Sequence, residues 1–210
     1  MCGRYSVLTE KEIIDIREIL QQISLQIVRD DFLQYDEKPG EIKPTNKAPV
    51  IALRDDGVSF ESQRFGIKNV NVPGIIFNAR SDTLETKYTF SRLLKAGRCV
   101  VPASEFFEWK HIDKKTSIKH YAKDREGNIL FFAGLYQDTE NGREFVIITK
   151  DSAGEMAKIH DRMPVILRAN QIEDWLNGNI NPKDLLNMEY DLTVMPCDED
   201  EVAQLSLFDV

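Results

Sequence analysis

The fold is decided by two neighbouring segments, Arg98-Cys99-Val100-Val101-Pro102 and Phe106-Phe107-Glu108-Trp109-Lys110. Both are rich in β-branched and aromatic residues, which pack well on the pleated surface of a sheet. Similar apolar segments recur from here towards the C-terminus, and Asp, Gly and Asn residues typical of turns separate them. The pattern predicts further strands at 117–121, 129–136, 145–149, 165–167 and 192–195.

The residues that precede this region predict helices as well as strands. Thr9 and Glu12 have the spacing of a capping box, and apolar residues then recur at helical spacing, which predicts a helix over 10–23. Further helices are expected at 88–96, at 152–159 and from a cap at Asn170 to Leu176, and further strands at 50–53, 58–65 and 75–77. Together these elements predict an α+β fold, a single domain with a mainly antiparallel β-sheet core flanked by short helices.

Length and composition limit the classes of protein that remain. The 210 residues fit one large domain better than two, and we expect it to span residues 1–203 and leave 204–210 as a C-terminal tail. The sequence lacks both a membrane-length apolar run and a signal-peptide pattern, so we expect a cytoplasmic protein with no membrane partner. The three cysteines, at positions 2, 99 and 197, are too widely spaced for a zinc site or a disulfide framework.

The formal net charge is −8 and the isoelectric point is near 5.0. Broad, non-specific affinity for DNA depends on neutralising phosphates with Lys and Arg, so this charge argues against it. Four of the 35 acidic residues lie together in Asp198-Glu199-Asp200-Glu201, near the C-terminus. A local basic groove elsewhere on the protein is therefore compatible with the overall charge.

Cys2 follows the initiator methionine, which is usually removed before a small residue. Removal would leave Cys2 with a free α-amine, of reference pKa ~7.7–8.0, beside a thiol of ~8.5 that ionises readily in electropositive surroundings. Such a 1,2-aminothiol condenses with an aldehyde to a thiazolidine ring, or acts as an N-terminal nucleophile in amide hydrolysis. The alternative is that Cys2 is an arbitrary residue on a frayed terminus.

Four later residues are candidates for the same chemistry. Asn78 can orient a substrate oxygen and Arg80 can hold a phosphate, unless they are merely a turn Asn and a surface Arg. Glu108 lies among aromatic residues, where desolvation raises a carboxyl pKa, although strand alternation could equally turn it towards water. His160 can act as a general acid or base, or simply complement a helix dipole. The other histidines, at positions 111 and 120, are expected on the solvated surface.

Taken together, four motifs resemble the SRAP (SOS-response-associated peptidase) family: Met1-Cys2-Gly3-Arg4, Asn78-Ala79-Arg80, Phe106-Phe107-Glu108-Trp109 and Ile159-His160-Asp161-Arg162-Met163-Pro164. The resemblance extends over nearly the whole chain and includes 98–103, 133–135 and 145–149. The chain departs from the family at Glu41-Ile42-Lys43-Pro44-Thr45, where relatives often carry Asn-x-Ala-Pro-Thr.

The resemblance implies a protein of the DNA damage response that captures abasic sites in single-stranded DNA. In that family the N-terminal Cys, here Cys2, forms a thiazolidine crosslink with the lesion. By the same resemblance, Asn78 orients the substrate, Glu108 and His160 act as acid–base residues, and no metal or other cofactor takes part. Matches to family phosphate contacts are Arg4, Arg80 and, less closely, Arg162. We expect a monomer that associates with the nucleoid when it is bound to DNA.

Two alternatives remain open at this point. The protein could be a thiol peptidase, acting on its own N-terminus, with Cys2 as nucleophile and His160 as base. It could also be a non-catalytic DNA-binding module in which Cys2 is incidental. Covalent capture of aldehyde-bearing DNA distinguishes the first interpretation from both alternatives.

The last residues include Gln204-Leu205-Ser206-Leu207-Phe208, after the acidic run. This stretch resembles the pentapeptide by which bacterial proteins bind the DNA polymerase sliding clamp. In such peptides the Gln forms hydrogen bonds in one pocket and the Leu-Phe pair fills an apolar one. The resemblance indicates clamp binding through Gln204, Leu205, Leu207 and Phe208, whereas the alternative is that the apolar residues fold back onto the domain.

Overall fold

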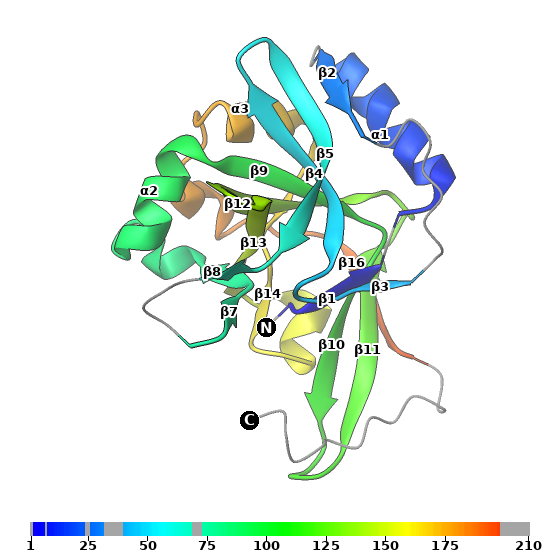
Figure 1. The fold of residues 1–210 in the computed structure, drawn as a ribbon. Coiled ribbons are helices and arrows are strands. Elements are labelled where there is room, and N and C mark those ends of the chain that lie inside the picture. The colour runs from blue at the N-terminus through cyan, green and yellow to red at the C-terminus, as the bar shows by residue number, and fades with distance from the viewer. Residues whose placement is uncertain (1, 7, 24–25, 32–39, 69–72, 198–210) are drawn as a thin grey trace.

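The computed structural model describes residues 2–6, 8–23, 26–31, 40–68 and 73–197. Within these ranges the strands form two large sheets and one two-stranded ribbon (Figure 1). Sheet A has the strand order β16-β11-β10-β1-β3 and consists of β1 (Arg4–Ser6), β3 (Glu41–Ile42), β10 (Phe106–His111), β11 (Ser117–Asp124) and β16 (Leu192–Pro196).

Sheet B follows the order β14-β13-β12-β9-β4-β5-β2, with β15 paired to β12 and β8 paired to β13. Most of its pairs are antiparallel, and β13 pairs in parallel with β5 and with β8, as β2 does with β5. Its strands are β2 (Ile27–Asp30), β4 (Lys47–Arg54), β5 (Gly57–Phe65), β8 (Asn78–Arg80), β9 (Arg98–Ala103), β12 (Leu130–Thr139), β13 (Gly142–Asp151), β14 (Arg162–Pro164) and β15 (Ile166–Leu167). The ribbon is formed by β6 (Ile67–Lys68) and β7 (Ile75–Ile76). These elements confirm the α+β fold with a mainly antiparallel core.

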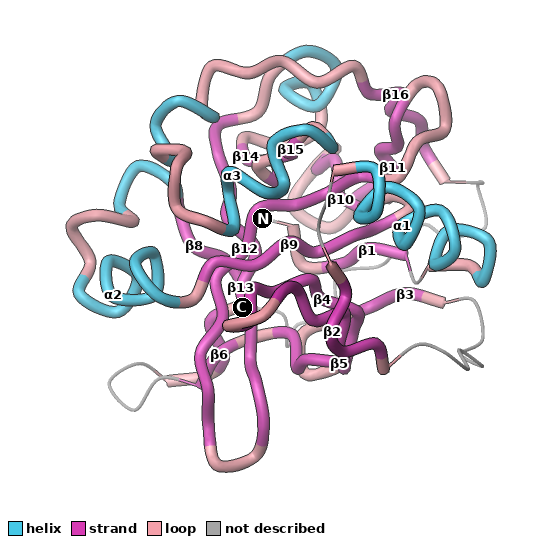
Figure 2. The backbone as a smooth tube through the Cα atoms, turned by 90° about the horizontal axis from the view of Figure 1, so that it is seen from above, coloured by secondary structure: helices cyan, strands magenta, loops and turns pink. Residues whose placement is uncertain are grey.

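Helices cover the sheets at opposite sides of the molecule, with α2 (Tyr88–Ala96) on one side and α1 (Glu10–Gln22) on the other (Figure 2). Helix α1 begins where the capping box predicted it. The side chain of Thr9 accepts from the backbone N–H of Glu12, and the Glu12 carboxylate accepts from the N–H of Thr9. The remaining helical segments are short: α3 (Ile172–Leu176), η1 (Ser81–Thr83), η2 (Gly154–Lys158), η3 (Ala169–Gln171) and η4 (Pro182–Leu185).

Two details of the predicted helices are wrong. The helix expected at 152–159 is only the 3₁₀ segment η2, and Asn170 does not cap α3. A 3₁₀ turn already begins at Ala169, and the carbonyl of the Gln171 side chain accepts from the N–H of Arg168 at 2.9 Å. The Gln171 amide thus satisfies the backbone N–H of Arg168 before the 3₁₀ turn, and α3 itself begins without a side-chain cap.

Sheet B is buried on both faces, which explains why its strands have continuous apolar sequences. Along β12, Phe131 and Ala133 pack into a core with α1 and α3, whereas Leu130 and Phe132 pack into a second core that includes Tyr5 and Phe106 of sheet A. The second core contains Cys2 as well. Packing of sheet A on sheet B is therefore what encloses the start of the chain.

No helix in the described ranges is long and apolar enough to span a membrane. The proposed tail at 204–210, with Gln204, Leu205, Leu207 and Phe208, lies outside the described residues, as does the acidic run at 198–201.

Candidate active site

Cys2 lies two residues before the start of β1 and is fully buried in the core between the two sheets. Its carbonyl accepts a hydrogen bond from the Asn78 side chain at 3.0 Å, and its Sγ lies 4.0 Å from the carbonyl oxygen of Arg4. Burial, reinforced by the nearby Glu108 carboxylate, raises the pKa of the Cys2 thiol well above its ordinary value. The surroundings are therefore not the electropositive ones that would favour a thiolate, and the resting sulfur carries its proton.

Asn78 reaches Cys2 from the first position of β8. That strand pairs in parallel with β13, with Asn78 opposite Ile147, and the Asn78 amide also donates to the Ile147 carbonyl at 3.4 Å. The amide oxygen Oδ1 is buried and accepts no hydrogen bond within the described part of the chain. Asn78 thus holds the backbone of Cys2 with its nitrogen and offers its oxygen to a further donor.

Glu108 approaches the same point from sheet A. Strand β10 pairs antiparallel with β1, with Arg4 opposite Phe107, so the next residue, Glu108, lies beside the segment that leads to Cys2. Glu108 is only 4% exposed, and the alternative in which it faces water is wrong because this face of sheet A packs on sheet B. Burial raises the pKa of the Glu108 carboxyl to about 7, and Asp161 acts in the same direction.

His160 completes the group from the loop between η2 and β14. Its Nε2 lies 3.9 Å from Glu108 Oε2, and burial lowers the pKa of the imidazole, so the ring is mainly neutral at pH 7. The other nitrogen, Nδ1, lies 3.0 Å from the N–H of Arg162 and 2.7 Å from the Asp161 carboxylate.

These two contacts of Nδ1 favour opposite tautomers of a neutral His160. If Nδ1 accepts from the Arg162 N–H, the proton is on Nε2 and faces Glu108. If Nδ1 donates to Asp161, Nε2 is an acceptor that faces Glu108. Nε2 can therefore offer either a donor or an acceptor towards Glu108, depending on the tautomer.

The three candidate phosphate ligands differ in accessibility. Arg4 is half-buried, lies over the Trp109 ring at 4.9 Å and pairs with Glu41 at 3.4 Å. Arg80 is exposed, and its fork is held by both oxygens of Asp82 at 3.1 and 2.8 Å.

Arg162 does not present its guanidinium to solvent. Its side chain is buried, pairs with the exposed Asp151 carboxylate and donates to the Thr149 carbonyl at 2.6 Å. Asp82 lies 4.0 Å away and links it to the surroundings of Arg80. A phosphate would reach Arg162 only by displacing these partners. The sequence motif by itself therefore overstates how available Arg162 is for phosphate binding.

Sequence reasoning missed a network beside the site. Lys119 pairs with the Glu41 carboxylate that also holds Arg4, and its ammonium lies 4.4 Å from the Phe107 ring. The expectation that His120 is a solvated surface residue is also wrong. Strand pairing sets His120 opposite Glu108 on the covered face of sheet A, where it is buried and its Nδ1 lies 3.0 Å from the Ile118 carbonyl. Strand alternation from Glu108 would have found this position.

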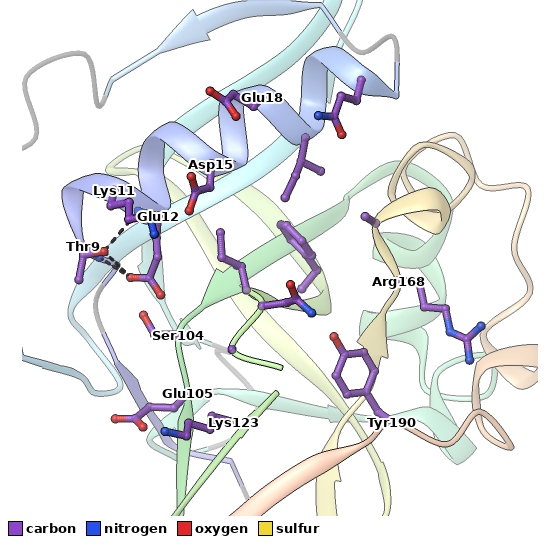
Figure 3. A pocket seen from close by; sticks show the side chains of 17 residues that line it. Thr9, Lys11, Glu12, Asp15, Glu18, Ser104, Glu105, Lys123, Arg168 and Tyr190 are labelled. Atoms are coloured by element: carbon purple, nitrogen blue, oxygen red, sulfur yellow. Dashed lines mark hydrogen bonds between the residues drawn. The ribbon is translucent and has the colours of Figure 1, made fainter. Parts of the chain in front are cut away.

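A groove of about 890 Å³ lies elsewhere, between α1 and the segments around Ser104, Asn128 and Tyr190 (Figure 3). Neither Cys2 nor any of the three residues around it, Asn78, Glu108 and His160, lines this groove. Its lining mixes acidic side chains, among them Glu12, Asp15 and Glu18 of α1, with the cations Lys11, Lys123 and Arg168. Across the described ranges, no group of three or more His, Cys, Asp or Glu side chains is arranged to hold a metal ion.

The chain is similar to several known proteins over most of its length. The profile of the family described as SOS response associated peptidase (SRAP) matches residues 1–204. The abasic site processing protein YoqW of Bacillus subtilis is 33% identical, over 96% of this chain and 90% of that protein. The abasic site processing protein YedK of Escherichia coli is 27% identical, over 88% and 83%. A crystal structure of a phage-related protein from Bordetella bronchiseptica is 23% identical and superposes with a TM-score of 0.74, over 94% of this chain and 95% of that one.

Proposed function

The chain belongs to the SOS response associated peptidase (SRAP) family, and from this premise we propose that it captures abasic sites in single-stranded DNA by covalent bonding to Cys2. The relatives named as abasic site processing proteins support the class of lesion. The observation that carries the proposal is the meeting of Asn78, Glu108 and His160 around the segment that bears Cys2. These residues come from four separate segments, and together they supply a nucleophile, an orienting amide and an acid–base pair.

The reaction requires removal of Met1, which frees the α-amine of Cys2. An abasic deoxyribose in its open form presents an aldehyde at C1′. The amine adds to C1′ and water leaves, which gives an imine. The Cys2 sulfur then adds to the same carbon while its proton passes to the imine nitrogen, and the thiazolidine ring closes. Water is the only product released, and no oxidant or reductant takes part.

Glu108 is suited to both proton transfers of this sequence. With a pKa of about 7 it is present in both protonation states near neutral pH. As an acid it protonates the departing hydroxyl, and as a base it accepts the proton of the Cys2 thiol, which burial keeps protonated until attack. General acid–base assistance of this kind typically contributes ~10²–10⁴-fold to a rate.

His160 can exchange protons with Glu108 through one bridging water molecule, because the 3.9 Å between Nε2 and Oε2 exceeds the length of a direct hydrogen bond. Because its two tautomers offer either a donor or an acceptor to Glu108, it can restore the carboxyl group to the state that each step needs. The same path run backwards assists reversal of the crosslink.

Asn78 fixes the backbone of Cys2, and its free amide oxygen can accept from a hydroxyl of the open sugar. Arg4 and Arg80 then hold the phosphates on the two sides of the lesion. For Arg80 this requires exchange of the exposed Asp82 carboxylate for a phosphate oxygen, which is a like-for-like replacement of one anion by another.

Incubation with single-stranded DNA that carries one abasic site, followed by a denaturing gel, tests the proposal. A heat-stable, Cys2-dependent band of increased mass is expected, and undamaged DNA of the same sequence is the control. Crosslinking by Cys2→Ala protein would assign the nucleophile to another residue. A thiol peptidase requires an activated sulfur, and the raised pKa of Cys2 counts against that alternative. Cleavage of unrelated peptides without DNA capture would support it.

We propose further that Gln204, Leu205, Leu207 and Phe208 bind the sliding clamp of a bacterial DNA polymerase. Attachment to the clamp would raise the effective concentration of the protein where a polymerase stops at a lesion. A titration of the cognate clamp should show modest affinity that is lost in Leu207→Ala/Phe208→Ala protein. Equal binding by both proteins, or no binding by the unaltered chain, would dismiss this partner.

A further inference from the structure

The outer face of sheet A, turned away from the core, carries a regular set of cationic and aromatic side chains. Strand register places Arg4, Phe107, Tyr121 and Met195 in one row across β1, β10, β11 and β16. Two residues further along, the neighbouring row brings Trp109 opposite Lys119. Because side chains alternate along a strand, both rows project from the same face.

Each aromatic ring on this face is paired with a cation. The Arg4 guanidinium lies 4.9 Å from the Trp109 ring centre, and the Lys119 ammonium lies 4.4 Å from that of Phe107. Lys123, two residues after Tyr121 on the same face, lies 5.4 Å from the Tyr121 ring. These three cation–aromatic pairs arise because basic and aromatic residues alternate on the outward-facing positions of β1, β10 and β11.

The residues of these pairs differ in exposure: some are buried and others are accessible to solvent. Phe107 and Lys119 are buried, so they form the floor of the face. Trp109 and Tyr121 are half-buried, Lys123 is exposed and Met195 is 50% exposed. The accessible rings therefore lie diagonally across the β10–β11 pair, where such positions are ~7–8 Å apart.

Local charge on this face differs from that of the whole chain. It carries the three cations Arg4, Lys119 and Lys123, and the Glu41 carboxylate at its edge pairs with the first two of them, although the chain has a net charge of −8. A net cationic surface with interleaved aromatic rings is the arrangement that binds single strands, with phosphates on the cations and bases on the rings.

We propose that the outer face of sheet A holds single-stranded DNA that flanks the lesion, with bases on Trp109 and Tyr121 and phosphates on Arg4 and Lys123. This inference rests on the proposed function, because it extends the same DNA strand beyond Cys2. Arg4 joins the two surfaces: it is two residues from Cys2 and is the first member of the row across sheet A. With ~4.8 Å between strands, the row from β1 to β16 extends the site by about 14 Å.

The cations already seated on the rings do not prevent stacking. An exposed cation–aromatic contact is weak, and a base that stacks on the Tyr121 ring can displace the Lys123 ammonium towards the adjacent phosphate. In this exchange the Lys123 ammonium stays close to its original position and gains a phosphate as an ionic partner in place of the ring. The ion pair between the buried Lys119 and the half-buried Glu41 is not needed for this exchange and can stay in place.

Fluorescence anisotropy with undamaged single-stranded oligonucleotides tests the inference without the crosslinking reaction. The oligonucleotides form a series of increasing length, and the variants are Tyr121→Ala and Lys123→Ala. Tyr121→Ala should weaken binding of the longer strands by between about fivefold and about 150-fold, as expected for loss of one base–aromatic stack. Lys123→Ala should reduce the slope of log affinity against log salt by about 0.7.

Two matched variants serve as controls. Tyr121→Phe keeps the ring and should bind like the unaltered chain, which separates stacking from a general loss of structure. Lys95→Ala removes an exposed lysine from α2, away from sheet A, and should leave the salt slope unchanged. If Tyr121→Ala does not fold, Lys123→Glu, at an exposed position, provides the same test through charge reversal.

Affinity that is independent of strand length, or that is equal in Tyr121→Ala, Lys123→Glu and unaltered protein, would overturn the inference. The proposed function would fail differently. A chain that binds long undamaged strands through Tyr121 but forms no bond with abasic DNA would refute capture by Cys2 and leave the outer face of sheet A intact as a DNA surface.

Discussion

Replacement of Glu108 by Gln should make the protein more stable at neutral pH and less active. The stability rises because a buried carboxylate that ionises is removed, and the activity falls because that carboxylate carries the proton transfers. Burial raises the pKa of Glu108 from an ordinary 4.5 to about 7 in the folded chain. The folded protein therefore binds more protons than the unfolded chain between these two pH values. Stability from this group is complete below about pH 4.5 and is lost as the pH rises to about 7.

The size of the effect follows from the same two values. At about 1.4 kcal/mol for each pH unit between 4.5 and 7, ionisation of Glu108 costs the folded state roughly 3 kcal/mol above pH 7. Between pH 5 and pH 8 the unaltered chain should lose about 2.5 kcal/mol that Glu108→Gln protein keeps. With a urea slope of ~2–3 kcal/mol/M, this difference corresponds to a shift of the midpoint by about 1 M.

The assay is urea unfolding at pH 5 and pH 8, followed by intrinsic fluorescence. Glu105→Gln, a change of the same type at a half-buried position just before β10, is the control and should leave the pH dependence as it is. In parallel, Glu108→Gln should slow crosslinking to abasic DNA by ~10²–10⁴-fold. Equal loss of stability between pH 5 and pH 8 in Glu108→Gln and unaltered protein would refute the reasoning from burial.

Three further predictions concern the nucleophile and the phosphate contacts. The intact mass of crosslinking-competent protein should lack Met1, and active protein that retains Met1 would exclude the thiazolidine mechanism. Cys2→Ala should abolish heat-stable crosslinks on a denaturing gel, and Cys2→Ser should do nearly the same because a hydroxyl closes a less stable ring. Arg80→Ala should weaken binding to all single-stranded sequences alike and lower the slope of log affinity against log salt by about 0.7, measured by fluorescence anisotropy. Asp82→Asn frees Arg80 from its carboxylate partner and should strengthen binding. An unchanged slope in Arg80→Ala protein would show that Arg80 does not bind phosphate.

Local pattern alone determined most of the elements of this protein. The capping box of Thr9 and Glu12 places the start of α1 because its hydrogen bonds are made within one helical turn. The strands of sheet B were predictable because β-branched and aromatic residues favour a pleated surface wherever the chain carries them. Cys2 was identifiable as a candidate nucleophile as well, since a 1,2-aminothiol requires only a cysteine directly after Met1.

The tertiary structure decided how these residues act. Sequence alternation could not say whether Glu108 faces water, because that depends on the packing of sheet A against sheet B, formed by segments far apart in the chain. The tertiary structure likewise decided that Arg162, held by Asp151 and the Thr149 carbonyl, is buried while Arg80 is exposed. It also raised the pKa of Cys2 and Glu108 and lowered that of His160, since desolvation depends on every segment that covers a group. The residues of the site were present in the sequence, but their protonation, accessibility and contacts come from three-dimensional proximity.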